Sequence, residues 1–207
     1  MAKQALIDIT PHKSIMRKIA QTGYKAEDAI AELVDNAIDA RGDNLNVDIT
    51  LSPDRIIVAD NGCGMDFETA SNAMKLGFST KKGQLGEFGL GLKTSALSMG
   101  GRFLLSTAQA GSPEEYSVAF DIEDWLEHGS WSGHVMDITE KENPEKSGTK
   151  VTIELLKFPV NEKLLERIRN HLGIRFGPYI SSGNVSISVN GSLCTPETPL
   201  LTSEGKK

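Results

Sequence analysis

The segment AELVDNAIDA, residues 31–40, has the pattern of a two-faced helix whose polar side is acidic. In an α-helix, Glu32, Asp35, Asn36 and Asp39 project within an arc of about 100°, and apolar residues occupy the opposite side. Surface helices usually pair carboxylates with basic residues one turn away, but residues 27–40 contain no Lys or Arg. Two interpretations follow: a solvated outer face, or a face that meets a metal ion or another polar ligand.

Composition and charge narrow the class of protein. The 207 residues are 39% hydrophobic and 24% charged, which is typical of one globular domain with a sizeable core. The net charge of -6 argues against electrostatic binding of nucleic acid or an anionic membrane by the surface as a whole. A local basic patch is not excluded by the net charge. Cys63 and Cys194 have no CxxC spacing, so neither a disulfide framework nor a zinc site is indicated. Because no secretory leader and no apolar run of 18 residues occurs, we expect a soluble, cytoplasmic protein without a membrane partner.

Periodicity along the chain predicts an α+β fold. A helix is expected over 24–40 and a β-hairpin over 46–60, with its turn at Ser52-Pro53-Asp54. Further helices are expected over 66–77, 91–100 and 161–173, and further strands over 101–109, 115–122, 133–139, 148–157 and 184–193.

Two glycine-bearing segments carry the clearest signs of chemistry. DNGCGM, residues 60–65, follows an apolar strand with glycines that let the backbone approach a ligand, although a simple hairpin turn has the same pattern. GEFGLGLKTSALSMG, residues 86–100, leads three glycines into a helix start beside Lys93, which favours phosphate; the alternative is a flexible loop. A Walker A loop does not fit because Leu92 separates Gly91 from Lys93, and a Rossmann fingerprint does not fit because Thr94 replaces its third glycine.

Four segments together resemble the motifs of the GHKL superfamily of gyrase, heat-shock chaperone, histidine kinase and MutL ATPases. AELVDNAIDA resembles the N box, DNGCGMD the first glycine box, GEFGLGLKTSALSMG the second glycine box and SGTKVTI the final threonine-bearing box, in that order. Within the superfamily, the loop AMKLGFSTKKGQLGEFGLGLKTS is most similar to Morc (microrchidia) ATPases. The resemblance covers residues 15–155.

The resemblance implies a two-layer α/β sandwich of the Bergerat type, with a mixed, mainly antiparallel sheet and helices on one face. The expected organisation is an N-terminal segment over 1–14 that forms a dimer surface, an ATP-binding domain over 15–158, and a helix and strand extension over 159–207. An ATP lid is expected over 77–88.

The resemblance also assigns roles on the acidic helix. Glu32 matches the general base toward the attacking water, and Asn36, one turn later, matches the ligand of the Mg²⁺ that bridges the phosphates. A spacing of four residues puts both on one helix face. The roles of Asp35 and Asp39 stay open; Asp35 could bond to the glycine boxes or to metal-bound water, and Asp39 could pair with Arg41.

The remaining boxes are expected to hold the nucleotide. Asp60 matches the acceptor of the adenine amino group, Thr149 supports that contact, and Gly62, Gly64 and Met65 line the base pocket. Phosphate contacts are expected from Gly86, Gly89, Gly91, Leu92 and Lys93, with Lys93 also offsetting charge during catalysis. In the lid, Ser79, Lys81 and Lys82 either touch phosphate or are solvated.

Three functions remain in consideration. The first is a Mg²⁺-dependent ATPase with slow turnover, whose lid closes on ATP and which dimerises. The second is a nucleotide-gated binding module with negligible turnover. The third is a histidine kinase catalytic domain, which is disfavoured because the only upstream histidine, His12, follows Pro11. Related ATPases carry a second domain that supplies another lysine to the γ-phosphate, and 48 residues after Pro159 are too few for it. A nucleic-acid or protein client has no support in the net charge.

Overall fold

The helices of the structure agree with most of those expected from the sequence. The structure is a computed structural model that describes residues 5–21, 23–78 and 89–197. The helix that carries the acidic side begins at Ala26 rather than near Tyr24, and Glu27 and Asp28 in its first turn suit the positive end of the helix dipole. The helices in these ranges are α1 Ile15–Ile19, α2 Ala26–Asp39, α3 Phe67–Ala73, α4 Gly91–Met99, α5 Ile122–His128, α6 Glu162–Arg175 and α7 Gly177–Ser181.

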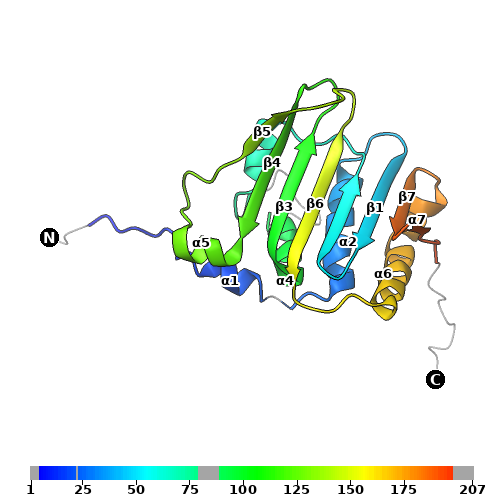
Figure 1. The fold of residues 1–207 in the computed structure, drawn as a ribbon, viewed down its shortest axis with the longest axis horizontal. Coiled ribbons are helices and arrows are strands. Elements are labelled where there is room, and N and C mark those ends of the chain that lie inside the picture. Colours follow the sequence, from blue (N-terminus) through cyan, green and yellow to red (C-terminus); the bar gives the residue numbers. More distant parts are fainter. Residues whose placement is uncertain (1–4, 22, 79–88, 198–207) are drawn as a thin grey trace.

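The strands form one sheet in the order β5-β4-β3-β6-β2-β1-β7-β8, with helices packed behind it in the view of Figure 1. All neighbouring pairs are antiparallel except β1 and β7, which run parallel. The α+β class with a mixed, mainly antiparallel sheet is therefore confirmed. The strands are β1 Leu45–Leu51, β2 Arg55–Asp60, β3 Gly100–Ala108, β4 Glu114–Asp121, β5 Asp137–Glu140, β6 Gly148–Leu156, β7 Val185–Val189 and β8 Ser192–Leu193.

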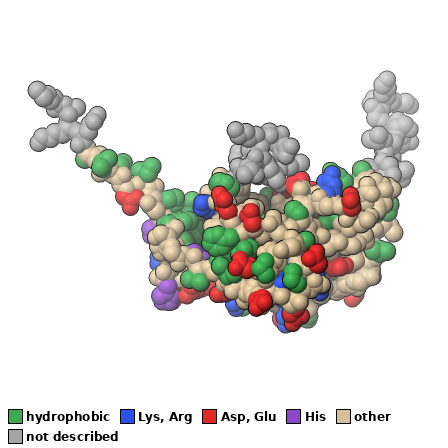
Figure 2. Space-filling model, turned by 90° about the horizontal axis from the view of Figure 1, so that it is seen from above, with side chains coloured by type: hydrophobic (Ala, Val, Ile, Leu, Met, Phe, Trp, Pro, Cys, Tyr) green, Lys and Arg blue, Asp and Glu red, His purple; other side chains and the backbone are tan. Residues whose placement is uncertain are grey.

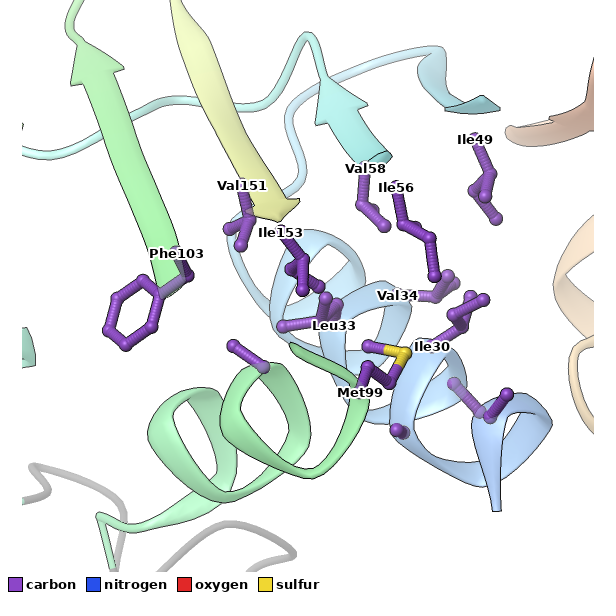
Figure 3. Packing of buried hydrophobic residues seen from close by; sticks show 14 of the residues in the cluster. Ile30, Leu33, Val34, Ile49, Ile56, Val58, Met99, Phe103, Val151 and Ile153 are labelled. Atoms are coloured by element: carbon purple, nitrogen blue, oxygen red, sulfur yellow. The ribbon is translucent and has the colours of Figure 1, made fainter. Parts of the chain in front are cut away.

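The core lies between the sheet and the apolar side of α2 (Figure 3). Alternate residues of β1 are buried and exposed, which is the period-2 pattern of a strand covered on one face. On α2, Ile30, Leu33 and Val34 point toward Ile56 and Val58 of β2, and all five are at most 4% exposed. Burying these side chains holds the helix in one rotational setting, so its acidic side must face away from the sheet.

Three short helices and part of one strand differ from the expectation. α1, α5 and α7 have only five to seven residues, too few to show a helical period. Asp121 begins α5 by accepting bonds from the amides of Glu123 and Asp124. The expected strand over 133–139 is reduced to β5, which starts at Asp137.

The surface offers no dominant basic patch on the face seen in Figure 2, where carboxylates are scattered among apolar and other side chains. The N-terminal segment runs outward from the body, and Leu6, Ile7 and Ile9 are each at least 79% exposed (Figure 1). Among the described residues, no helix is long and apolar enough to cross a membrane.

Candidate functional site

A cavity of about 460 Å³ lies between α2, the start of α4 and the loop after β2. Residues from all four sequence motifs line the cavity, and Thr149 of β6 represents the last of them. Of the predicted site residues, those that line it are Glu32, Asn36, Asp60, Gly64, Met65, Gly89, Gly91, Leu92, Lys93 and Thr149.

The acidic side of α2 is divided between this cavity and a basic side chain. Glu32, Asn36 and Asp39 line the cavity. Asp35, in contrast, forms an ion pair with Arg175, and the same Nη2 atom lies 3.1 Å from Glu32 Oε1. The positive group expected against this face is therefore partly supplied by the chain itself, from the last residue of α6. Arg41 Nη1 donates to the carbonyl of Ile38 at 2.7 Å, and the pairing of Asp39 with Arg41 stays a prediction.

The carboxyl of Asp35 illustrates the electrostatics of this helix. Its pKa is raised, first because burial disfavours the charged form. Arg175 acts in the opposite direction, whereas the neighbouring charges of Glu32 and Asp39 raise the pKa further. For Asp35, the attraction of Arg175 therefore offsets only part of the effect of burial and of the neighbouring carboxylates.

Asp60 and Thr149 lie opposite each other across β2 and β6. Asp60 Oδ1 accepts from the amide of Gly62 at 2.8 Å and from that of Thr149 at 3.2 Å. These two bonds use one oxygen, and no described residue donates to Oδ2, so Oδ2 has capacity for a ligand N–H. The pKa of Asp60 is raised by burial, which the two backbone bonds partly oppose. Gly62 itself does not line the cavity; it contributes through this bond.

Thr107 was not identified from the sequence, and it forms hydrogen bonds to two of the cavity-lining residues, Met65 and Thr149. It pairs with Thr149 across β3 and β6, and their hydroxyl oxygens are 3.1 Å apart. The Thr107 hydroxyl also accepts from the amide of Met65 at 2.9 Å. Gly64, the residue before Met65, has a φ of 66°. A Cβ at Gly64 would lie 1.9 Å from the carbonyl oxygen of Ala108, so only glycine fits.

The first turn of α4 places Gly91, Leu92 and Lys93 at the cavity. Lys93 is only 3% exposed, and its Nζ donates to the carbonyl of Ala73 at 2.5 Å. Burial lowers the pKa of Lys93 to about 8. A buried ammonium beside amide groups at a helix start is suited to an anion.

Phe78, near the start of the expected lid, lies close to Gly89, the residue after its end, beside the cavity. Gly89 has φ 60°, and a Cβ at this residue would lie 2.1 Å from the carbonyl oxygen of Phe78. Gly89 is therefore a position where the close approach of the Phe78 backbone requires glycine. The remaining lid calls, on Gly86, Ser79, Lys81 and Lys82, lie outside the described residues.

The side chains fit a Mg²⁺ ion that retains most of its ligands from water and phosphate. Asn36 is exposed at the cavity wall and, among the described residues, makes no side-chain hydrogen bond that would occupy its amide oxygen. No group of three or more His, Cys, Asp or Glu in the described part of the chain forms a metal-binding cluster. Because Mg²⁺ is commonly bound by one or two protein oxygens plus phosphates and waters, a single amide ligand suits it.

Comparison with known proteins agrees with this geometry. A family model described as histidine kinase-, DNA gyrase B- and HSP90-like ATPase matches residues 24–151, more than half of the chain. ATPase morc-1 of Caenorhabditis elegans is 40% identical over 86 residues, which are 40% of this chain and 10% of that protein. Protein MICRORCHIDIA 3 of Arabidopsis thaliana is 38% identical over 85 residues, 36% of this chain and 14% of that protein.

A bacterial relative extends the comparison over more of the chain. The DNA mismatch repair protein MutL of Crocosphaera subtropica is 30% identical over 148 residues, 69% of this chain and 26% of that protein. The chain thus spans about a quarter or less of the length of these relatives. It belongs to the histidine kinase-, DNA gyrase B- and HSP90-like ATPases, the GHKL superfamily, and it is similar to the Morc and MutL proteins within that superfamily.

Proposed function

We propose that the chain binds Mg²⁺·ATP in the 460 Å³ cavity and hydrolyses it slowly. The observation that carries the proposal is the placement of two chemically different walls around one space. Asp60 and Thr149 form a polar wall with one unfilled carboxylate oxygen, whereas Glu32 and Asn36 face the first turn of α4. A base with an exocyclic amine suits the first wall, and a triphosphate with Mg²⁺ suits the second.

In the proposed reaction, Glu32 accepts a proton from water as the water oxygen bonds to the γ-phosphorus. The bond from that phosphorus to the bridging oxygen breaks, and ADP leaves with the electron pair. Asn36 would hold the Mg²⁺, which supplies charge neutralisation of the phosphates. Lys93 and the amides at Gly91 and Leu92 would stabilise the same negative charge.

The base contact predicts a preference for adenine. While ionised, Asp60 accepts from an amino group but repels the carbonyl that guanine has at the corresponding position. We expect ATP to bind at least tenfold more tightly than GTP, and Asp60→Asn to weaken ATP binding, since an unpaired polar group costs on the order of 1–3 kcal/mol. Isothermal titration calorimetry with both nucleotides measures this difference, and equal affinities would remove the adenine assignment.

Turnover is tested separately from binding. Glu32→Ala should keep its affinity for a non-hydrolysable ATP analogue while losing most multiple-turnover phosphate release, because a positioned general base contributes about 10²–10⁴-fold. A variant with the wild-type rate would make the acidic side of α2 merely a solvated face.

A nucleotide-gated binding module is the second candidate, favoured by the exposed Leu6, Ile7 and Ile9 of the N-terminal segment. In both candidates, ATP closes a lid over 77–88 and promotes a homodimer through residues 1–14, whereas ADP does not. Light scattering with ATP analogue or ADP tests the dimer, and phosphate release separates an ATPase from a module.

A further inference from the structure

The acidic side of α2 packs against a row of basic side chains on α6, a helix that lies outside the four sequence motifs. Successive members of the row are four residues apart and therefore share one face of α6. Near the start of α6, Arg167 pairs with Glu27 at 3.2 Å. The full set of contacts is Arg167 with Glu27, His171 with Asp28, and Arg175 with both Glu32 and Asp35.

Arg175 differs from the other members because it reaches the cavity wall. Its Nη2 bonds to Glu32 Oε1 and also to Asp35, so a single nitrogen joins the two carboxylates. The side chains of Arg175 and Glu32 are 31% and 23% exposed, which limits the screening of their attraction by water. The next residue, Phe176, is 1% exposed and anchors this end of α6 in the core.

The second oxygen of Glu32 lies near the start of α4. A Cβ built on Gly91 would lie 3.7 Å from Glu32 Oε2. Thus Oε1 is held by Arg175, while Oε2 is directed to the helix end whose amides are suited to phosphate. One carboxylate group therefore has a bound oxygen and a presented oxygen.

We propose that Arg175 is a positioning residue that orients Glu32 for its work as general base. The inference rests on the proposed function, and it adds a residue from the C-terminal extension to the reaction. A free glutamate side chain samples several rotamers, and the ion pair with Arg175 restricts Glu32 before substrate arrives. Arg175 also offsets the repulsion between Glu32 and Asp35, which would otherwise turn the two carboxylates apart.

The test compares Arg175→Ala with a matched variant, Arg167→Ala, which removes the same kind of side chain from the same face of α6. Among the described residues, Arg167 has an ion pair only with Glu27. The kcat and KM for ATP are measured by phosphate release, and the affinity for a non-hydrolysable ATP analogue with Mg²⁺ is measured by calorimetry. We expect Arg175→Ala to lower kcat about 10- to 100-fold, since misplacing a catalytic group by about 1 Å costs on the order of 10²-fold. The analogue affinity should change several-fold less than kcat, and Arg167→Ala should stay within about twofold of wild type in both.

A double variant separates positioning from a general structural effect. If Arg175 acts through Glu32, Arg175→Ala should lower the residual single-turnover rate little further in a Glu32→Gln background. Arg175→Lys should recover part of the loss, because it keeps a positive charge but lacks the planar guanidinium that places Nη2 between the two carboxylates. Circular dichroism checks that each variant is folded, and Arg175→Gln takes the place of Arg175→Ala should the latter unfold.

Two results would overturn the inference while leaving the proposed function in place. One is a wild-type kcat in Arg175→Ala. The other is an equal loss of rate from Arg175→Ala in the wild-type and Glu32→Gln backgrounds, which would mean that Arg175 does not act through Glu32. A wild-type chain that binds ATP but releases no phosphate would instead refute hydrolysis itself, so the two failures are distinguishable.

Discussion

Lys93 lets the proposed site be tested through stability rather than activity. Its side chain is 3% exposed, and its ammonium donates to one backbone carbonyl, that of Ala73. Such a buried charge lowers the stability of the ligand-free fold, and an anionic ligand would offset that cost. We therefore expect Lys93→Met, which keeps most of the length of the side chain and removes the charge, to stabilise the fold and to impair nucleotide binding.

The magnitude follows from the pKa of Lys93. A decrease from the ordinary value of 10.5 to about 8 corresponds to a penalty of about 3 kcal/mol for the charged form in the folded state. Loss of the hydrogen bond to Ala73 offsets about 1 kcal/mol of the gain. The net expectation at pH 7 is a free energy of unfolding about 2 kcal/mol higher for Lys93→Met, or roughly 4–8 °C in Tm for a chain of this size.

The pKa of Lys93 also determines how the stability difference between Lys93→Met and wild type changes with pH. Below pH 8, Lys93 is protonated in both the folded and the unfolded chain, so the folded protein bears the whole penalty. Between pH 8 and 10.5, the unfolded chain binds more protons than the folded one, and wild-type stability gains from rising pH. The advantage of Lys93→Met should therefore be largest at pH 7 and shrink as pH rises through this window.

Urea unfolding at pH 7 and pH 9.5 measures the difference between variant and wild type, in which the titration of all other groups cancels. Lys163→Met, at an exposed position on α6, is the matched control and should show little pH-dependent change. Calorimetry with an ATP analogue then measures binding. The reasoning is refuted if Lys93→Met is less stable than wild type at pH 7, or if its stability difference is the same at both pH values.

Three further perturbations test individual parts of the site. Asn36→Ala should remove the Mg²⁺ dependence of ATP-analogue binding, and calorimetry with and without Mg²⁺ that shows an unchanged dependence would rule out Asn36 as the ligand. Gly64→Ala should destabilise the fold by well over the 1–2 kcal/mol of left-handed backbone strain, because its Cβ would overlap a β3 carbonyl; Gly111→Ala, at φ 77° with open space, should cost only that strain in urea unfolding. Thr107→Val should cost about 1–3 kcal/mol in the same assay by leaving the amide of Met65 unpaired, and an unchanged midpoint would contradict this.

Elements with a clear hydrophobic period were predicted well from the sequence. The alternation in Val47, Ile49 and Leu51 defined β1, and the apolar side of α2 defined the packing against the sheet. The parallel pairing of β1 with β7 could not be predicted, because Leu45 and Val185 are about 140 residues apart and nothing local specifies their register. The short helices α1, α5 and α7 were not predicted because each contains too few residues to show a helical period.

The sequence predicted those residues of the cavity that belong to local motifs. Motif residues such as Glu32 and Asp60 do line one cavity. Thr107, within an ordinary strand pattern, gave no sign of its bond to Met65. Arg175 did leave a signal, since it ends a four-residue spacing of basic side chains on α6, but only the fold shows that this face meets α2.

The absence of basic residues within α2 now has a structural explanation. A lysine or arginine one turn from Glu32 on α2 would compete for the side that lines the cavity, where Mg²⁺ and its phosphates are proposed to bind. Arg175 approaches from α6 instead and takes one oxygen of Glu32, while Asn36 remains at the cavity wall. The positive charge of Arg175, from a helix distant in sequence, therefore stabilises the carboxylates of Glu32 and Asp35 without occupying the side of α2 that lines the cavity. We therefore expect that moving the positive charge from α6 onto α2 would preserve the net charge of the fold and still abolish the proposed ATP hydrolysis.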